Sequence, residues 1–532
     1  MPRRLVLAGL AFGLFFGHLP SPARARELTR PLFITESDLG PNRTYTLQED
    51  LSAPGTAVFI MVPDATIELA GHTITFGTDD RDGTVGVYPF DSRTAFPLGA
   101  DDVNYPETLK PAHGARCTVQ NGRVVWAGKK GKWATAVGGA YSKGPITVRN
   151  CSLSSGGPDG ACVHFNWAAL VIHDCYCFNT SSSTENRHAG PANVWCGGKT
   201  TAYRNILIGG CSAFHVGSGS EAHENVMRQS GFATNGYGFG SYRGEDCQVY
   251  RNLIVPTNGR GVIFDHGRRD HVYENFICVH EKPNAEFGTA LNAPCVRLRY
   301  DATENEFLRN ECLAIGGPGG GNAAASGAYF TCQPGTQNLV AENEFIAIAA
   351  GDPVPNAHYA NALTFEGQGK PGGPGTDRVE RNRLAGNNYL IRLSGYDGGC
   401  FQNPIVGNSL EWISGRAAAE WAFQILDSPR FQFQYPDDNR YVTAETLQSI
   451  RTSVKAEILE LIGQEGDDRK RAVFYTGYNG HPSSITLLET KLRNVKWDDR
   501  AIFVEKSNAK APIDIRIGES ATGETIALIP AR

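Results

Sequence analysis

One repeated motif constrains this chain more than any other feature of its sequence. A charged or polar residue, then asparagine, then a short apolar strand recur in phrases such as RNLIV, ENFIC and ENEFI. The unit is twenty-odd residues long, and such a unit cannot bury its apolar side alone, so successive units must stack as a solenoid. The repeat places an asparagine at nine positions: Asn150, Asn205, Asn225, Asn252, Asn275, Asn305, Asn343, Asn382 and Asn408. Asp174 takes the asparagine position between Asn150 and Asn205.

Three consecutive units match without a gap, which independent segments would not do. Within each of two sets, successive residues lie 27 and then 23 positions apart. The sets are Gly217, Gly244 and Gly267, and Asn225, Asn252 and Asn275. Asparagine suits a recurring turn because it tolerates left-handed backbone and can bond to the turns above and below it. Equivalent residues of the three units are therefore predicted to form columns, with about 4.8 Å between neighbours.

The N-terminal stretch alternates apolar and polar residues, the period-two pattern of half-buried strands. Its phrases ELAGHTITF and VQNGRVV, together with the asparagine repeat, resemble the pectin-lyase-like right-handed parallel β-helix superfamily over residues 40–415. The resemblance implies an all-β right-handed parallel β-helix and a polysaccharide partner. It implies no single activity, because the superfamily includes lyases, hydrolases, epimerases, esterases and phage tailspikes.

The repeat ends after Leu410, so we divide the chain into a signal peptide (1–25), a β-helix (26–415) and a small α+β C-terminal appendage (416–532). In the appendage an amphipathic helix is predicted from Thr443 to Gly463, followed by short strand-like segments. We expect this region to cap the solenoid end, whose last coil would otherwise expose an open edge. The predicted apolar face of the helix consists of Leu447, Ile450, Val454, Ile458 and Leu461.

The first residues are typical of an export signal. Arg3 and Arg4 precede an apolar run from Leu5 to Phe16, and the small-residue pattern Ala23-Arg24-Ala25 follows. The pattern predicts a secreted or periplasmic protein and leaves the Sec and twin-arginine routes open. No later apolar run reaches the roughly 18 residues of a membrane span.

The charge balance argues against broad nucleic-acid binding. Without the three arginines of the signal peptide, 47 basic residues face 55 acidic ones, and the net charge is −8. Phosphate neutralisation needs a basic surface, so a polysaccharide is the expected partner and nucleic acid is not. The oligomeric state is left open.

All 13 cysteines lie between Cys117 and Cys400, inside the predicted solenoid. Some could form disulfides in an oxidising compartment. We favour the alternative that they stack inside the coils as small apolar residues, since free cysteine is among the most buried residue types. No cysteine or histidine spacing indicates a structural zinc site.

The three matched units also place reactive side chains in columns. His215, Tyr242 and Asp265 form one predicted column, and Arg243 and His266 lie beside Val216 in the next. Alternation points the first column outward, with Phe214 and Phe264 pointing into the core. These five polar residues are the candidate catalytic set.

Further reactive residues surround that set and are candidates for binding the substrate. Each also has a simpler interpretation, because an exposed charge is commonly solvated or paired, and surface ion pairs contribute only about 0 to 1 kcal/mol. Two of them belong to a long loop that could fold over the same face, Arg187 and His188. The others are His223, Arg268, Arg269, Arg297 and Arg299.

The resemblance favours a polysaccharide lyase that cleaves a uronate-containing, acidic glycan by β-elimination. That reaction needs a cation at the uronate carboxylate, a base for the C5 proton and an acid for the leaving oxygen. The resemblance gives the base and acid roles to His215, Tyr242 and His266, and the carboxylate to Arg243, Arg297 or Arg299. No calcium-binding acidic cluster of the pectate lyase kind is present, so we predict no cofactor, with calcium as the alternative.

Two alternatives stay open. A glycoside hydrolase of the same fold needs two carboxyl groups about 5 to 9.5 Å apart, and only Asp265 lies in the outward column. A non-catalytic glycan-binding or surface scaffold protein would use the same face without turnover. The sequence does not identify the sugar.

Overall fold

The computed structural model describes most of the solenoid and separate pieces of the C-terminal region. The described residues are 25–89, 116–139, 144–181, 192–228, 236–256, 259–280, 293–316, 325–332, 336–349, 360–367, 377–387, 389–395, 405–413, 444–462, 474–477, 483–493, 502–504, 513–518 and 525–530. Of the predicted signal peptide only Ala25 lies among them.

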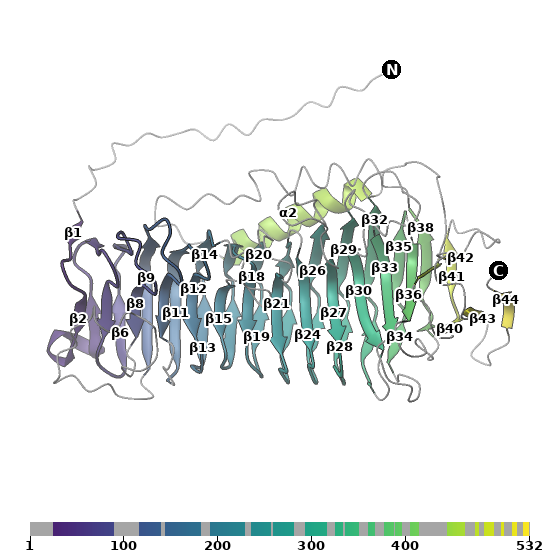
Figure 1. The fold of residues 1–532 in the computed structure, drawn as a ribbon, viewed down its shortest axis with the longest axis horizontal. Helices are drawn as coiled ribbons and strands as arrows, with labels where there is room; N and C mark the ends of the chain where they lie inside the picture. Colours follow the sequence, from purple (N-terminus) through teal and green to yellow (C-terminus); the bar gives the residue numbers. More distant parts are fainter. Residues whose placement is uncertain are drawn as a thin grey trace, which may run out of the picture.

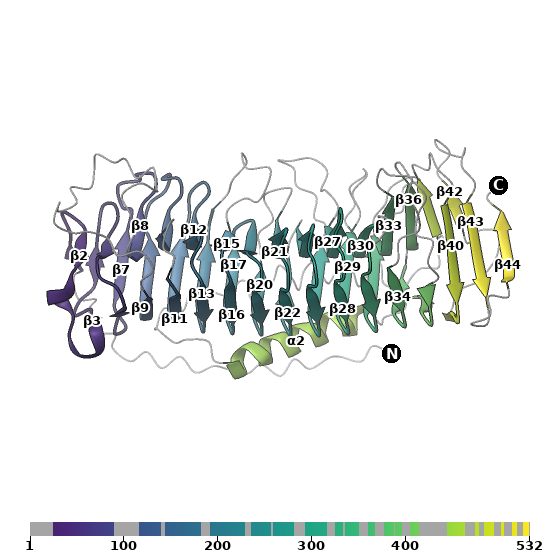
Figure 2. The same cartoon turned by 90° about the horizontal axis from the view of Figure 1, so that it is seen from below.

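The chain winds into one elongated solenoid whose coils follow one another along the long axis (Figures 1 and 2). Each coil supplies one strand to each of three parallel sheets. In one coil β12 (Ala161–Phe165) belongs to the first sheet, β13 (Leu170–His173) to the second and β14 (Tyr176–Asn179) to the third. The next coil repeats this order, and its strands pair in parallel with those before them. The predicted right-handed parallel β-helix is thus confirmed.

The first sheet carries the candidate site and has 15 strands. Besides β12 they are β2 (Leu32–Ile34), β5 (Val58–Ile60), β8 (Val85–Pro89), β10 (Thr135–Gly139), β15 (Ala192–Cys196), β18 (Ser212–Val216), β21 (Tyr237–Tyr242), β24 (Arg260–Asp265), β27 (Ala293–Arg299), β30 (Ala325–Cys332), β33 (Ala360–Gly367), β36 (Tyr389–Gly395), β39 (Phe474–Gly477) and β42 (Ile502–Val504).

The second sheet follows the first within each coil. Besides β13 it contains β3 (Thr44–Thr46), β6 (Ala65–Glu68), β16 (Thr200–Tyr203), β19 (Glu221–His223), β22 (Gln248–Tyr250), β25 (His271–Tyr273), β28 (Glu306–Leu308), β31 (Leu339–Ala341), β34 (Arg378–Glu380), β37 (Ile405–Val406), β40 (Ser483–Leu488), β43 (Ile513–Gly518) and the antiparallel β44 (Thr525–Pro530).

The third sheet completes each coil. Two long strands, β9 (Cys117–Trp126) and β11 (Ile146–Ser155), run through both the second and third sheets, and short 3-10 helices span Glu36–Asp38 and Pro41–Arg43. Besides β14 the sheet contains β1 (Arg26–Glu27), β4 (Leu51–Ser52), β7 (Thr73–Phe76), β17 (Ile206–Gly209), β20 (Val226–Arg228), β23 (Leu253–Ile254), β26 (Phe276–His280), β29 (Glu311–Gly316), β32 (Glu344–Ala349), β35 (Arg383–Gly386), β38 (Ser409–Trp412) and β41 (Lys491–Arg493).

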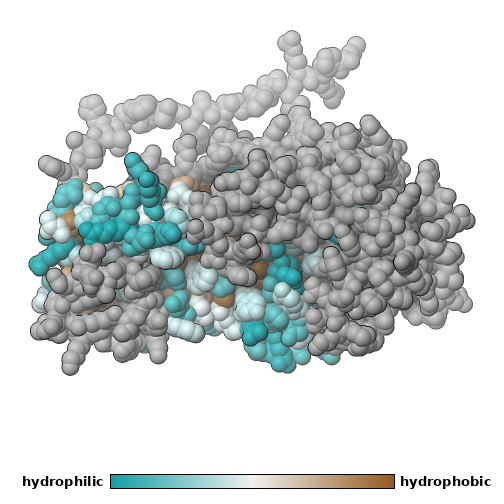
Figure 3. Space-filling view, in the orientation of Figure 1, coloured by the Kyte–Doolittle hydropathy of each residue, from teal (hydrophilic) through white to brown (hydrophobic). Residues whose placement is uncertain are grey.

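Alternation along the strands builds the core. In β6 Ala65 and Ile67 are buried while Thr66 and Glu68 are partly exposed. One continuous apolar cluster runs from the first coils to Leu487, because every coil adds inward residues above those of the last. Where the described surface is visible in Figure 3, hydrophilic residues predominate over small apolar areas.

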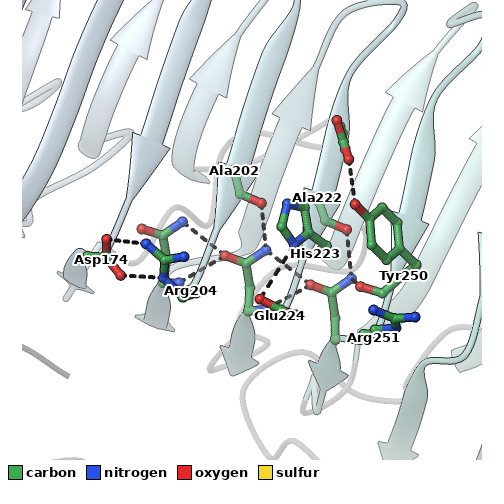
Figure 4. Close-up of polar contacts among 12 residues, drawn as sticks. Asp174, Ala202, Arg204, Ala222, His223, Glu224, Tyr250 and Arg251 are labelled. Atoms are coloured by element: carbon green, nitrogen blue, oxygen red, sulfur yellow. Dashed lines mark hydrogen bonds and ion pairs between the residues drawn. The ribbon is translucent and has the colours of Figure 1, made fainter. Parts of the chain in front are cut away.

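An asparagine ladder fills the turn between the second and third sheets. The side-chain oxygen of Asn252 accepts hydrogen bonds from both the backbone N–H (2.9 Å) and the side-chain amide (3.0 Å) of Asn225. The Asn225 amide also donates to the carbonyl of Ala202, which is labelled in Figure 4. Asn252 repeats the pattern toward Asn275. These buried amides are satisfied from coil to coil, which explains why the asparagine recurs.

Three members of the predicted set belong elsewhere: Asn150, Asp174 and Asn305. Asn150 and Asp174 lie one position before the ladder, and Cys175 takes the ladder position next to Asn205, to whose side-chain oxygen its backbone N–H donates. Asn310, not Asn305, continues the ladder from Asn275. Asn305 instead lies in a second ladder, in the turn between the first and second sheets, with Asp270 before it and Asn338 after it. The prediction of Asn305 failed because the phrase around it fits the motif equally well, and hydrogen bonding alone separates the two ladders.

The residue before each ladder asparagine has a left-handed backbone, and its charge alternates from coil to coil. Glu224, Arg251 and Glu274 have φ values of 56°, 53° and 55°. Arg251 contacts Glu274 at 3.0 Å, and Arg204 contacts Asp174 at 2.7 Å in the same column. Alternation places opposite charges next to one another at this turn.

Helix α2 (Ala444–Ile462) lies alongside the coils, as Figures 1 and 2 both show, and does not cap their end. Its buried residues Leu447, Val454 and Ile458 join a cluster made by outward apolar residues of the third sheet, including Leu253 and Phe276. The predicted helix is therefore present, with its apolar side on the solenoid wall.

The strands after residue 416 extend the sheets. β39 pairs with β36, β40 with β37 and β41 with β38, all in parallel. The predicted boundary at residue 416 itself lies outside the described residues. Among the described strands, the antiparallel β43–β44 pair is the last pairing of the second sheet.

The cysteines behave as small core residues. The eleven whose side chains are described are all buried and free of disulfides. Burial raises the pKa of the Cys117 thiol to about 12, so this thiol is protonated and unreactive at neutral pH. Among the described residues, no helix is long and apolar enough to cross a membrane.

Candidate functional site

The outer face of the first sheet carries two rows of polar and aromatic side chains. Strand β18 directs two successive residues, Ala213 and Phe214, into the core, so its outward residues are Ser212 and His215, three positions apart. Later strands keep this spacing. The first row is Ser212, Tyr237, Arg260, Pro294, Ser326 and Asn361, and the second is His164, Trp195, His215, Gly240, Ile263, Arg297, Tyr329, Thr364 and Arg392.

A histidine and a tyrosine from adjacent coils meet on this face. The Tyr237 hydroxyl lies 2.5 Å from Nδ1 of His215. Tyr237 reaches His215 by lying over Gly240, where an added Cβ would come within 2.4 Å of the tyrosine ring. Gly240 is therefore required for the contact, and this glycine has a packing role that its position in the strand does not reveal.

Burial shifts the pKa of both members of the pair. It lowers the pKa of His215 to about 4, with a smaller contribution from the nearby His164. The imidazole is therefore neutral at physiological pH and able to accept a proton. Burial also raises the pKa of Tyr237 above its usual range, so the phenol is protonated at neutral pH.

Two more aromatic rings extend the row on the N-terminal side of His215. The Trp195 ring lies 4.3 Å from the His215 ring and 5.9 Å from the His164 ring, measured between centroids. Nε2 of His164 lies 3.1 Å from the side-chain oxygen of Asn166. This part of the face offers ring surfaces together with polar edges.

Two buried guanidinium groups lie on the C-terminal side of the pair. Nη2 of Arg297 contacts Oδ2 of Asp265 at 2.6 Å, and the Arg297 side chain is only 6% exposed. Burial, together with the charge of Arg297 and against that of Asp265, lowers the pKa of Arg260 to about 9. Burial also lowers the pKa of Arg297. Buried charge is stable only when it is compensated, and Asp265 compensates Arg297 through one of its guanidinium nitrogens.

Several buried atoms here have no hydrogen-bond partner among the described residues. They are Nε of Arg297, Oδ1 of Asp265 and both amide atoms of Asn361. A buried polar group left unpaired costs about 1 to 3 kcal/mol. Buried polar groups are normally satisfied, so these exceptions on one face indicate a place for a ligand.

The structure corrects the predicted column of His215, Tyr242 and Asp265. Tyr242 lies opposite Asp265 as expected, but His215 lies opposite Gly240. The offset is 25 residues between β18 and β21 and 27 residues between β19 and β22, so two extra residues lie in the turn after β21. A two-residue shift keeps the face, and Phe214 and Phe264 do point into the core. In the neighbouring predicted column, Arg243 and His266 therefore do not align with Val216.

Four predicted residues lie at the rim where the first sheet turns into the second. The Tyr242 side chain is 59% exposed, and its ring meets the His266 ring edge-on at 5.5 Å. His266 also stacks on Tyr300 at 4.5 Å and contacts Asp301. The remaining two place guanidinium groups over these rings, Arg243 over Tyr242 and Arg299 over Tyr300.

The other predicted binding residues divide between ion pairs and a different face. Arg268 contacts Glu304, and Arg269 contacts Glu245 and Asp246, so these charges form surface ion pairs. His223 lies on the second sheet, stacked between Tyr203 and Tyr250. Arg187 and His188 lie outside the described residues.

The sequence interpretation missed Tyr237, Arg260, His164, Trp195 and Asn361. A usable signal existed for the first. Aligning Phe214 with Phe239, at an offset of 25, would have placed Tyr237 and Gly240 beside His215. Among the described residues no group of three or more histidine, cysteine, aspartate or glutamate side chains is placed to hold a metal ion.

No protein-family profile and no curated protein matches this chain. Solved structures of similar fold include DFA-IIIase from Arthrobacter chlorophenolicus A6 in complex with GF2, at 12% identity over 66% of this chain and 82% of that chain, with a TM-score of 0.30. A cysteine-to-alanine mutant of that enzyme matches over 91% and 90%, at 12% identity and a TM-score of 0.33. Tailspike protein 3 of bacteriophage CBA120 matches over 72% and 53%, at 9% identity and a TM-score of 0.30. At TM-scores of 0.30 to 0.33, these matches assign no activity to this chain.

Proposed function

We propose that the protein is a polysaccharide lyase that cleaves a uronate-containing glycan by β-elimination on the outer face of the first sheet. The observation that carries the proposal is the His215–Tyr237 pair next to Arg260, Arg297 and Asp265. This combination offers proton transfer and anion binding side by side, the two requirements of elimination from a uronate.

The two arginines would bind the uronate carboxylate. Nε of Arg297 is buried without a partner, and Arg260 lies one coil away on the same face. Pairing the carboxylate with these cations withdraws charge from the ring and makes the C5 proton more acidic. The same cations stabilise the negative charge that develops as that proton leaves.

The histidine and tyrosine would transfer the protons. The phenolic oxygen of Tyr237 takes the C5 proton while its own proton moves to Nδ1 of the neutral His215. The C4–O bond breaks, a C4–C5 double bond forms, and the pair returns one proton to the leaving oxygen. The pair is restored after each turnover, with no net proton consumed and no cofactor used.

A hydrolase is the weaker candidate. It needs two carboxyl groups flanking the bond. Among the described side chains of the two rows there is no carboxylate, and Asp265, just beyond the second row, is already held by Arg297. The rim residues Tyr242, Arg243 and His266 remain candidates for substrate contact, because they adjoin Asp265 at the end of the strands.

A polymeric substrate accords with export, which we propose on the basis of residues 1–25.

Calcium is tested by adding a chelator to the assay. Loss of turnover that calcium restores would contradict the metal-free scheme.

Product analysis on polygalacturonate, alginate, hyaluronan and the neutral fructan inulin tests the proposal. We expect an acidic polymer to yield an unsaturated end that absorbs ultraviolet light. Plain reducing ends would mean hydrolysis, and binding without new ends would mean a non-catalytic protein. Tyr237→Phe should abolish the absorbance, and Tyr242→Phe, the matched change at the rim, should retain most of it.

A further inference from the structure

A second polar cluster lies on the outer face of the first sheet, further toward the C-terminal end. Asn361 follows Ser326 in the first row, and Thr364 follows Tyr329 in the second. The Ser326 and Thr364 hydroxyl groups lie 2.9 Å apart, which ties the two rows together at this point. The proposed elimination does not use any of these side chains.

Asn361 distinguishes this cluster from ordinary packing. The residue is fully buried, and neither its amide nitrogen nor its amide oxygen has a hydrogen-bond partner among the described residues. Its strand neighbour Ala362 points into the core, so Asn361 points outward onto the same face as Ser326. An amide in this position can donate two hydrogen bonds and accept two.

We propose that Asn361, Ser326 and Thr364 form a second subsite, which binds the hydroxyl groups of another sugar unit of the same glycan. This inference rests on the proposed function and specifies its substrate as an extended chain. Amide and hydroxyl groups both donate and accept, as sugar hydroxyls do. The cluster therefore suits a hydroxylated ring, whereas the arginines suit a carboxylate.

The position of the cluster fixes the direction of the chain. Arg297 pairs with Tyr329, Tyr329 with Thr364, and Thr364 with Arg392. Two strand spacings separate Arg297 from Thr364, a distance of about 10 Å. The glycan must then run along the solenoid axis, across the strands, and Tyr329 lies between the two subsites. Arg392, buried one coil further, continues the same row.

Chain-length dependence tests the subsite. The probes are a trisaccharide and a hexasaccharide of whichever acidic polymer wild type cleaves or binds. Asn361→Ala and the isosteric Thr364→Val should lower kcat/KM for the hexasaccharide about tenfold, the effect of one or two lost hydrogen bonds, and leave the trisaccharide nearly unchanged. Equal losses on both probes, or none on either, would overturn the proposal.

A ladder asparagine supplies the structural control. The amide of Asn343 donates to the carbonyl of Phe307 and to Asn382, so its hydrogen bonds are satisfied. Asn343→Ala should lower the melting temperature, whereas Asn361→Ala should not, because no hydrogen bond is lost in the free protein. A melting temperature that falls equally in both variants would show that Asn361 has a structural role and would contradict the subsite.

This test separates the subsite from the elimination chemistry. If wild type releases plain reducing ends, elimination is wrong, yet the length dependence is still measured in the same assay. If wild type binds a polymer without cleaving it, calorimetry with the same two probes replaces kcat/KM. Failure of wild type to bind any of the acidic polymers would contradict both proposals.

Discussion

Two regions of the molecule differ in whether their buried polar groups are hydrogen-bonded. One is the turn between the second and third sheets, and the other is the outer face of the first sheet. At the turn, the ladder asparagines are hydrogen-bonded to the coils before and after them, as the bonds of Asn225 and Asn252 show. Figure 4 shows the amide hydrogen bonds that reach the carbonyls of Ala202 and Ala222. On the outer face, Asn361 and parts of Arg297 and Asp265 are buried and unpaired. The same residue type therefore stabilises the fold where its hydrogen bonds are satisfied and indicates a ligand site where they are not.

The largest effect should come from the proton-transfer pair. His215→Ala and Tyr237→Phe each remove one member of the 2.5 Å contact. We expect turnover of the acidic polymer to fall by about 100-fold to 10,000-fold, the usual contribution of a positioned acid or base. Initial rates of ultraviolet absorbance increase measure this. Full activity in both variants would place the active site elsewhere, and the rim residues Tyr242 and His266 would then be tested next.

The second largest effect should come from the asparagine ladder at the turn between the second and third sheets. Asn252→Ala removes an amide that donates to Ala222 and Asn275, and an oxygen that accepts from Asn225. We expect the free energy of unfolding to fall by about 3 kcal/mol, because the neighbouring ladder groups are left buried and unpaired. Urea denaturation measures the loss. Turnover per folded molecule should be unchanged, and a variant of wild-type stability would contradict the ladder's role.

The third prediction concerns pH. The folded pKa of His215 is about 4, against an ordinary value of 6.5. Between these values the unfolded chain binds a proton that the folded chain does not, so this residue makes stability fall as pH falls from 6.5 toward 4. Above pH 6.5 it has no effect. Histidine NMR, assigned with His215→Ala, should show a midpoint near 4, and a midpoint at or above 6.5 would contradict the described burial.

The smallest effect should come from the surface ion pairs. Arg269 contacts Asp246 at 2.8 Å and Glu245 at 2.9 Å, and all three side chains are well exposed. Arg269→Ala should change stability by no more than about 1 kcal/mol and leave turnover as it is. Activity assays and denaturation curves check both points. A tenfold loss of turnover would mean that this residue binds substrate, as the sequence first suggested.

The sequence revealed the fold because the repeat is a direct consequence of it. The stacked turns require asparagine at one position, and this requirement is visible as the offset between Asn225, Asn252 and Asn275. The helix around Val454 was also predictable, since its apolar spacing is independent of where it packs. Its place on the solenoid wall was not, because that depends on outward apolar residues of distant strands.

The site was only partly predictable for a related reason. His215 and Asp265 were found because they lie on matched strands. Tyr237 was missed because two extra residues follow β21. The offset is therefore 25 residues in the first sheet and 27 in the second, and the register that we took from the asparagine turn does not apply to the first sheet. Arg260 and Asn361 were missed because their significance lies in burial, and a single sequence does not show which outward residues are covered.

The most direct test of the central claim is a crystal structure of the Tyr237→Phe variant soaked with a hexasaccharide of the polymer that wild type cleaves. The account predicts a glycan running along the first sheet, with one carboxylate within hydrogen-bonding distance of Nε of Arg297 and a hydroxyl group on the amide of Asn361. A glycan bound at the rim around Tyr242 and His266, or on another face, with both of those groups still unpaired, would contradict it.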